Sequence, residues 1–220
     1  MTSTSVAGTS PGNRLIQLCY VRLAVRQPQP AAAFATDILG LQAVPDKQGL
    51  LFRSDERYHT LSLVTDTSTS STGIEVADQA TLERVADTLK KEGFVARYAS
   101  PEECAGRFVR SALIAWDATG NEIDLVLRPA LSGRRYFPSR DAGVTGLQSI
   151  GLRSKAPKDD LKFWTSILGA QVSDWVGDIA YLRFDNKHHR IALYPSDRAS
   201  AAKAVLELSS LQRLLCLPLL

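Results

Sequence analysis

The chain has 220 residues, of which 45% are hydrophobic and 22% are charged, and its formal net charge is +3. This length is enough for one or two domains with a real hydrophobic core, and the composition is that of an ordinary globular protein. A net charge of +3 is too small to indicate a partner such as nucleic acid or an anionic membrane.

The two ends of the chain and its cysteines give further expectations. Residues 1–13 have neither a basic segment nor an apolar segment of a signal peptide, so they predict a flexible tail. The apolar runs of the chain are too short for a membrane span. Its three cysteines share no metal-type spacing, which predicts reduced thiols and a cytoplasmic location.

The first part of the chain predicts one β-α-β-β-β unit. A strand is expected over residues 15–25, followed by a helix over 28–39 that ends at Gly40. We expect Phe34, Ile38 and Leu39 to form the apolar face of that helix. Short strands are expected over 41–44, 50–53 and 59–65, separated by turn sequences.

The next segment predicts a second unit of the same kind. Residues 66–73, rich in Ser and Thr, are expected to be a linker, and a strand is expected over 74–76. Asp78 is the predicted cap of a helix that continues to Leu89. Strands follow over 94–98, 108–116 and 122–127. Together the two units make an expected N-terminal domain over residues 14–130.

A linker over residues 131–146, marked by Pro and Gly, is expected to lead into an incomplete C-terminal domain over 147–196. That domain predicts a strand from Leu147 to Ser154, a helix from Asp159 to Leu168, and three further strands. The expected strand ranges are 171–175, 178–185 and 189–194.

Three short blocks of the first unit recur in order in the third. Two blocks recur 129 residues later and the last recurs 130 residues later, at Leu18/Leu147, Phe34/Phe163 and His59/His189. Blocks that keep both order and spacing indicate an internal duplication. The predicted fold class is therefore α+β, built from repeated βαβββ units, two in the N-terminal domain and one in the C-terminal domain.

The duplication leads us to expect a fourth unit, but residues 197–220 form an atypical apolar tail rich in Ala, Leu and Ser. Three interpretations stay open. The tail is a C-terminal helix over an open sheet edge, a helix that binds a partner, or a sequence unrelated to its ancestor through truncation or a reading-frame change. We favour the last, because the duplication sets up an expectation of a fourth unit that the tail does not meet.

The repeated units resemble the vicinal oxygen chelate superfamily, which includes glyoxalases, bleomycin resistance proteins and dioxygenases. The resemblance covers residues 14–196 and is carried by the F-x-T-x-I-L-G helix ends and by the segment D-I-A-Y-L-R-F-D-x-x-H-H-R-I-A-L over 178–193. The second copy resembles type I extradiol ring-cleavage dioxygenases, which open catechol-like rings in the catabolism of aromatic hydrocarbons. The resemblance therefore implies an aromatic small molecule as the partner.

The resemblance also implies a site. Such enzymes hold Fe(II) with two His and one carboxylate of the C-terminal domain. Ser149 occupies the position of the first His, and a hydroxyl is a poor replacement for imidazole. The other two ligands belong to the missing fourth unit, so we expect C-terminal truncation and no iron binding by this chain.

Two positions of the family's site remain. His189 matches a catalytic His that moves protons beside the substrate, and Tyr181 matches an aromatic residue that lines the catechol pocket. The competing interpretation is a structural or vestigial role, with His188 and His189 on opposite faces of a strand.

A metal site in the N-terminal domain, made by His59, Glu122 and Asp124, is disfavoured because its opening strand offers only Cys19 and Tyr20. Three functional hypotheses stay open. The first is a protein like the extradiol dioxygenases whose activity is lost or needs a partner chain. The second is a metal-free protein that binds small aromatic molecules. The third is a truncated, inactive product that is folded over residues 14–130 and self-associates as a homo-oligomer through unpaired edges.

Overall fold

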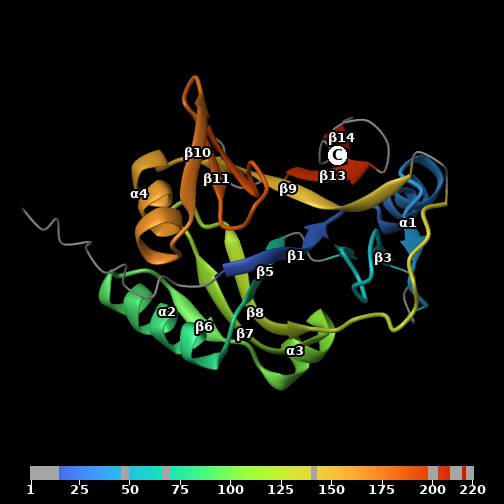
Figure 1. Cartoon of the computed structure of the whole chain (residues 1–220), viewed down its shortest axis with the longest axis horizontal. Helices are drawn as coiled ribbons and strands as arrows, with labels where there is room; N and C mark the ends of the chain where they lie inside the picture. The colour runs from blue at the N-terminus through green and yellow to red at the C-terminus, as the bar shows by residue number, and fades with distance from the viewer. Residues whose placement is uncertain are drawn as a thin grey trace, which may run out of the picture.

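The computed structural model describes residues 15–45, 50–65, 70–139 and 143–197, and the backbone of residues 203–208 and 215–216 (Figure 1). The expected flexible tail of residues 1–13 lies outside the described residues. The chain forms two mixed sheets with helices at one end and along the outside, which confirms the α+β fold class. None of the described helices is long and apolar enough to cross a membrane.

The first sheet contains the two units predicted for the N-terminal domain. Its eight strands are ordered β2-β3-β4-β1-β5-β8-β7-β6. The long strand β1 is central, parallel to β4 of its own unit and antiparallel to β5 of the next. The strands are β1 (Leu15–Ala24), β2 (Gln42–Ala43), β3 (Leu51–Arg53), β4 (Leu61–Val64), β5 (Ser71–Val76), β6 (Ala96–Tyr98), β7 (Val109–Trp116) and β8 (Glu122–Pro129).

The first helix differs from the prediction in which side chains it buries. α1 (Pro28–Ala33) continues as a π-helical turn over Phe34–Ile38, and Gly40 follows with a φ of +68°. The matching residues of the third unit, Phe163 and Ile167, lie in the same kind of π-turn and are buried. Leu39 is buried as expected, but Phe34 and Ile38 are 40% and 60% exposed. Their assignment to the apolar face was wrong.

The second unit begins earlier than predicted. β5 starts at Ser71, inside the segment expected to be a linker, and Gly73 lies opposite Tyr20 of β1. A Cβ atom on Gly73 would lie 2.4 Å from the Tyr20 ring, so the position needs glycine. The helix that follows, α2 (Gln79–Lys91), is capped as predicted, because the Asp78 side chain accepts a hydrogen bond from the Thr81 amide.

The second sheet repeats the arrangement around another long central strand, β9 (Val144–Ser154). β9 is parallel to β12 and antiparallel to β13, in the strand order β10-β11-β12-β9-β13-β14. Its other elements are α4 (Pro157–Lys162), a π-helical turn over Phe163–Ile167, β10 (Gln171–Val176), β11 (Ile179–Arg183), β12 (Ile191–Pro195), β13 (Lys203–Leu208) and β14 (Leu215–Cys216). The third βαβββ unit is therefore present.

The tail is not helical where the structure describes it. Residues 203–208 form β13 along the open edge of β9, so the expected helix is wrong for this segment. β13 lies beside β9 as β5 lies beside β1, and Val205 faces Ser149 as Gly73 faces Tyr20. β13 thus takes the place of the first strand of a fourth unit, which the sequence analysis did not find.

The two sheets share one hydrophobic core. β9 runs beside β1, and buried side chains of both halves belong to one continuous cluster (Figure 1). Phe94, after α2, packs against Phe163 of the third unit with ring centroids 5.3 Å apart. Trp164 is fully buried in the same cluster. Apolar packing therefore fixes the third unit on the N-terminal domain.

A buried carboxylate joins the two halves through hydrogen bonds. Asp160 of α4 is fully buried and accepts from the Thr119 amide at 3.0 Å and from the Thr119 hydroxyl at 2.5 Å. Ser154 at the end of β9 also donates to it, at 2.5 Å. Thr119 lies in the turn between β7 and β8, so Asp160 connects that turn to the third unit.

Removing this carboxylate is expected to destabilise the protein. Asp160→Ala removes the acceptor of three hydrogen bonds, one from the buried Ser154 and two from the partly buried Thr119, and we expect the free energy of unfolding to fall by about 3 kcal/mol. Asp159→Ala is the matched control, since Asp159 is an exposed Asp in the same helical turn. Urea denaturation of both variants measures the difference, and equal midpoints would contradict the role given to Asp160.

Candidate functional site

Two of the predicted site residues lie together in the C-terminal half. Tyr181 is on β11, and His189 lies in the loop just before β12. Their rings meet edge to face, with centroids 4.8 Å apart and planes at 71°. Both side chains are partly exposed, so an aromatic ligand has access to them. The third predicted position, Ser149, is buried on β9 at 1% exposure.

The expectation that His188 and His189 lie on opposite faces of a strand was wrong. β12 begins only at Ile191, and both histidines belong to the preceding loop. Their Nδ1 atoms are 3.0 Å apart, so the two side chains point toward one another. Burial, followed by the nearby His188 and Arg190, lowers the pKa of His189 below its ordinary value.

The loop is fixed by Arg190. Its guanidinium pairs with Asp185 at 2.7 Å and donates to the carbonyl oxygens of Leu147 and Gln148 on β9. Arg190 thus ties the histidine loop to the strand that carries Ser149. The sequence analysis missed this residue. The signal was an Arg that directly follows two histidines and lies five residues after Asp185.

The duplication places a second, equivalent position in the N-terminal domain, where Tyr20 corresponds to Ser149. The Tyr20 hydroxyl donates to Asp124 at 2.9 Å. Ser71 and Arg107 Nε donate to the same carboxylate oxygen, at 2.7 Å and 2.9 Å. Arg107 also contacts Glu122 at 3.1 Å. Both acidic residues of the disfavoured N-terminal metal site are therefore paired with an arginine.

Arg107 reaches this position from a helix that the sequence analysis missed. α3 (Pro101–Arg107) begins with a capping box between Ser100 and Glu103 and has Pro at its first position. The sequence Ser-Pro-Glu-Glu is a known helix start and could have revealed it. α3 packs Cys104 against Cys19 and Tyr20, so it closes this face of the first sheet.

His59 packs into the same region as a core side chain. It is 4% exposed, stacks on Tyr20 at 5.0 Å and meets Phe108 edge-on. Burial, with a smaller contribution from Arg22, lowers its pKa to about 4. Its Nε2 atom has no hydrogen-bond partner in the part of the chain that the structure describes. At neutral pH His59 is therefore an uncharged ring.

No three side chains of His, Cys, Asp or Glu gather as a possible metal site within the described residues. Ser149, the expected first-ligand position, is paired in the strand register with Val205 of β13. The chain has three histidines in all. His59 lies in the first sheet's region, and His188 and His189 lie in the loop before β12.

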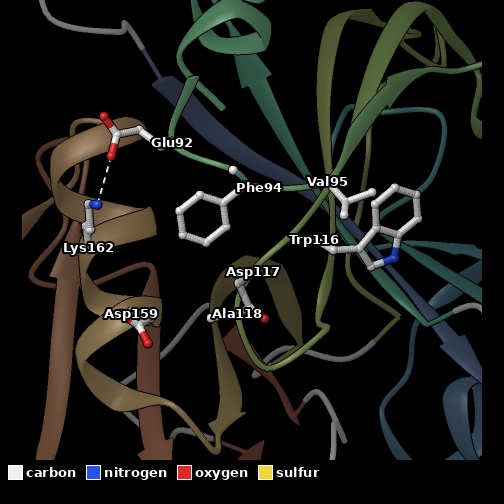
Figure 2. Close-up of a pocket in the computed structure, with 9 residues that line it drawn as sticks. Glu92, Phe94, Val95, Trp116, Asp117, Ala118, Asp159 and Lys162 are labelled. Carbon is white, nitrogen blue, oxygen red and sulfur yellow. Dashed lines mark ion pairs between the residues drawn. The ribbon is translucent and has the colours of Figure 1, made fainter. Parts of the chain in front are cut away.

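A cavity of about 390 Å³ lies between the two halves (Figure 2). It is lined by the end of α2, the turn after β7 and one side of α4, and Phe94 points into it. An ion pair between Lys162 and Glu92, at 2.8 Å, spans its rim. None of the predicted site residues lines this cavity, so it is separate from the site at Tyr181 and His189.

Comparisons with known proteins agree with this architecture. A biphenyl-2,3-diol 1,2-dioxygenase of Pseudomonas sp. strain KKS102 is 29% identical over 196 residues, which cover 80% of this chain and 67% of that protein. A 1,2-dihydroxynaphthalene dioxygenase of Pseudomonas putida is 26% identical over 178 residues, which cover 76% of this chain and 57% of that protein. The chain is a relative of the extradiol dioxygenases of the vicinal oxygen chelate superfamily.

Solved structures of such dioxygenases share the fold. A 2,2',3-trihydroxybiphenyl 1,2-dioxygenase from Sphingomonas wittichii strain RW1 has a TM-score of 0.76 and 21% identity, covering 90% of this chain and 74% of that one. A catechol 2,3-dioxygenase has a TM-score of 0.74 and 24% identity, covering 84% and 69%. No protein-family model matches the chain.

The resemblance inferred from the repeated blocks is therefore confirmed for family and fold. This extradiol dioxygenase relative spans from about 57% to 67% of the length of the curated relatives it matches. The names of these relatives give aromatic diols as their substrates. One structural neighbour, a glyoxalase from Novosphingobium aromaticivorans, binds Mn(II).

The buried His59 predicts a pH dependence of stability. Between pH 6.5 and about 4 the unfolded chain binds a proton at this position and the folded chain does not, so stability falls as the pH falls through that window. Complete titration corresponds to about 3 kcal/mol. His59→Phe keeps the ring contacts and should remove this part of the slope, measured by urea denaturation at several pH values.

The control for this measurement is Tyr98→Phe, which changes an exposed aromatic side chain of β6 that carries no charge between pH 4 and 6.5. That variant should keep the wild-type slope. A His59→Phe variant with an unchanged slope between pH 6.5 and 4 would show that His59 titrates normally in the folded protein.

Proposed function

We propose that this extradiol dioxygenase relative does not cleave aromatic rings with the residues of this chain alone. The observation that carries the proposal is the residue at the expected first-ligand position. Ser149 is buried on β9, where the family's arrangement calls for a histidine. A neutral hydroxyl does not replace an imidazole on Fe(II), which needs two imidazoles and a carboxylate here.

The remaining histidines support the same proposal. His59 is buried beneath Tyr20, and its neighbouring carboxylates are occupied by Arg107. His188 and His189 are held in the loop before β12. Ring cleavage by this protein would then require ligands from another polypeptide, which is the partner-chain hypothesis.

Iron content and oxygen consumption test this proposal. We expect protein purified anaerobically over a chelating resin to retain far less than one iron per chain, and to consume no oxygen with 2,3-dihydroxybiphenyl. Ser149→His restores one of three ligands and should not change either result. Stoichiometric iron with oxygen uptake in the wild-type protein would overturn the proposal.

A second candidate function is the binding of an aromatic molecule without a metal. The edge-to-face contact between Tyr181 and His189 favours it, because the pair offers an aromatic face and a polar ring nitrogen at a partly exposed position. In this function Tyr181 contacts the ligand ring and neutral His189 hydrogen-bonds a phenolic hydroxyl. The relatives' aromatic diols suggest the ligand class.

Ligand titration tests this second function. We expect saturable binding of 2,3-dihydroxybiphenyl by calorimetry, and an affinity about tenfold lower in Tyr181→Ala, because one aromatic contact is worth about 1 kcal/mol or more. Tyr98→Ala is the control, since Tyr98 is an exposed tyrosine on β6 of the other sheet. Equal affinities in the two variants would exclude Tyr181 from the binding site.

The other expectations about context remain proposals. Cys19 and Cys104 are both buried as free thiols, which supports a cytoplasmic location. Self-association of this chain has support in β10, an edge strand that exposes Val172, Trp175 and Val176.

A further inference from the structure

Two consecutive imidazoles, those of His188 and His189, are arranged like a pair of ligands. Their Nδ1 atoms are 3.0 Å apart and their ring planes are at 88° to each other. A metal ion that binds two nitrogens at about 2.0–2.1 Å in neighbouring coordination positions holds them about 3 Å apart. The separation in this loop therefore matches the bite of a chelate.

We propose that His188 and His189 form a two-nitrogen binding site for a divalent first-row transition metal, with water in the remaining coordination positions. Imidazole nitrogen suits Cu(II), Ni(II) and Zn(II), and among these Cu(II) binds most tightly to a given set of nitrogen ligands. Both ligands come from the same loop, so the site does not depend on a second chain.

The loop that carries the two histidines is anchored at both ends. Asp185 accepts a hydrogen bond from the Lys187 amide at 3.0 Å and pairs with Arg190 at 2.7 Å. Arg190 in turn donates to carbonyl oxygens of β9, and β12 begins at the next residue. Because these bonds close the loop before any ligand arrives, little conformational entropy is lost on metal binding.

The local charge and protonation also suit a cation. The positive charge of Arg190 is neutralised by Asp185, the carboxylate it contacts. A neutral imidazole has one ring nitrogen with a lone pair that can bind a cation. Without metal, one Nδ1 carries a proton that it donates to the other. With metal, both Nδ1 atoms bind the ion and the protons lie on Nε2.

This site uses other side chains than the expected iron position of the family. Ser149 is buried on β9, whereas His188 is exposed to solvent. His189 was expected to act as a proton carrier, not as a ligand, so metal binding at its Nδ1 is a different role. The proposed site does not rest on whether the chain cleaves aromatic rings or binds an aromatic molecule.

Copper titration tests the site. We expect the full-length protein to bind one Cu(II) with nitrogen coupling from two imidazoles in its electron paramagnetic resonance spectrum. His188→Ala and His189→Ala should each weaken binding at least about tenfold, since losing even an outer partner of a ligand costs about 10–100-fold. Asn186→Ala, an exposed neighbour in the same loop, should bind Cu(II) as the wild-type protein does.

The outcomes separate the proposal from its alternatives. Circular dichroism first checks that all three variants keep the wild-type fold. Equal affinity in His188→Ala and Asn186→Ala, loss of affinity in only one of the two histidine variants, or coupling to fewer than two imidazole nitrogens would each overturn the chelate. The iron and oxygen measurements have no bearing on these results, so the two proposals fail independently.

Discussion

Everything in this protein is arranged around two long strands, each shared by two neighbouring units. β1 pairs in parallel with the last strand of its own unit and antiparallel with the first strand of the next, and β9 does the same with β12 and β13. A central strand whose two edges are both paired leaves its backbone groups satisfied. Its side chains must then fill the space between the units. The residue at the middle of each strand therefore determines which polar groups lie between the units.

The two halves fill that middle position in opposite ways. In the first sheet a tyrosine, an arginine and a buried carboxylate form a polar network, and α3 covers it. Tyr20, Ser71 and Arg107 all donate to Asp124 Oδ2, whereas Asp124 Oδ1 has no hydrogen-bond partner within the described residues. In the second sheet the equivalent residue is a small serine, and the polar groups are displaced to the loop before β12. The histidines of this half, His188 and His189, therefore lie beside the second sheet and not on its central strand.

Much of the fold could be predicted because the duplication appears directly in the sequence, at spacings that insertions had hardly altered. The failures have physical causes. The exposure of Phe34 and Ile38 depends on what packs over their helix, because the matching Phe163 and Ile167 lie in the same kind of π-turn and are buried. The strand at 203–208 depends on the open edge of β9, and a long-range pairing of this kind overrides local propensity. The orientation of His188 and His189 depends on where β12 begins. The ends of strands are the features that a sequence predicts least well.

The contact between Gly73 and Tyr20 restricts the order in which this sheet can change over evolutionary time. A Cβ atom on Gly73 would overlap the tyrosine ring, so every larger residue at position 73 is blocked while Tyr20 is present. Replacing Tyr20 first removes the block but leaves Asp124 with only Ser71 and Arg107 as hydrogen-bond donors, and it opens a void beside the glycine. Either first step therefore carries a cost, so positions 20 and 73 are expected to change together.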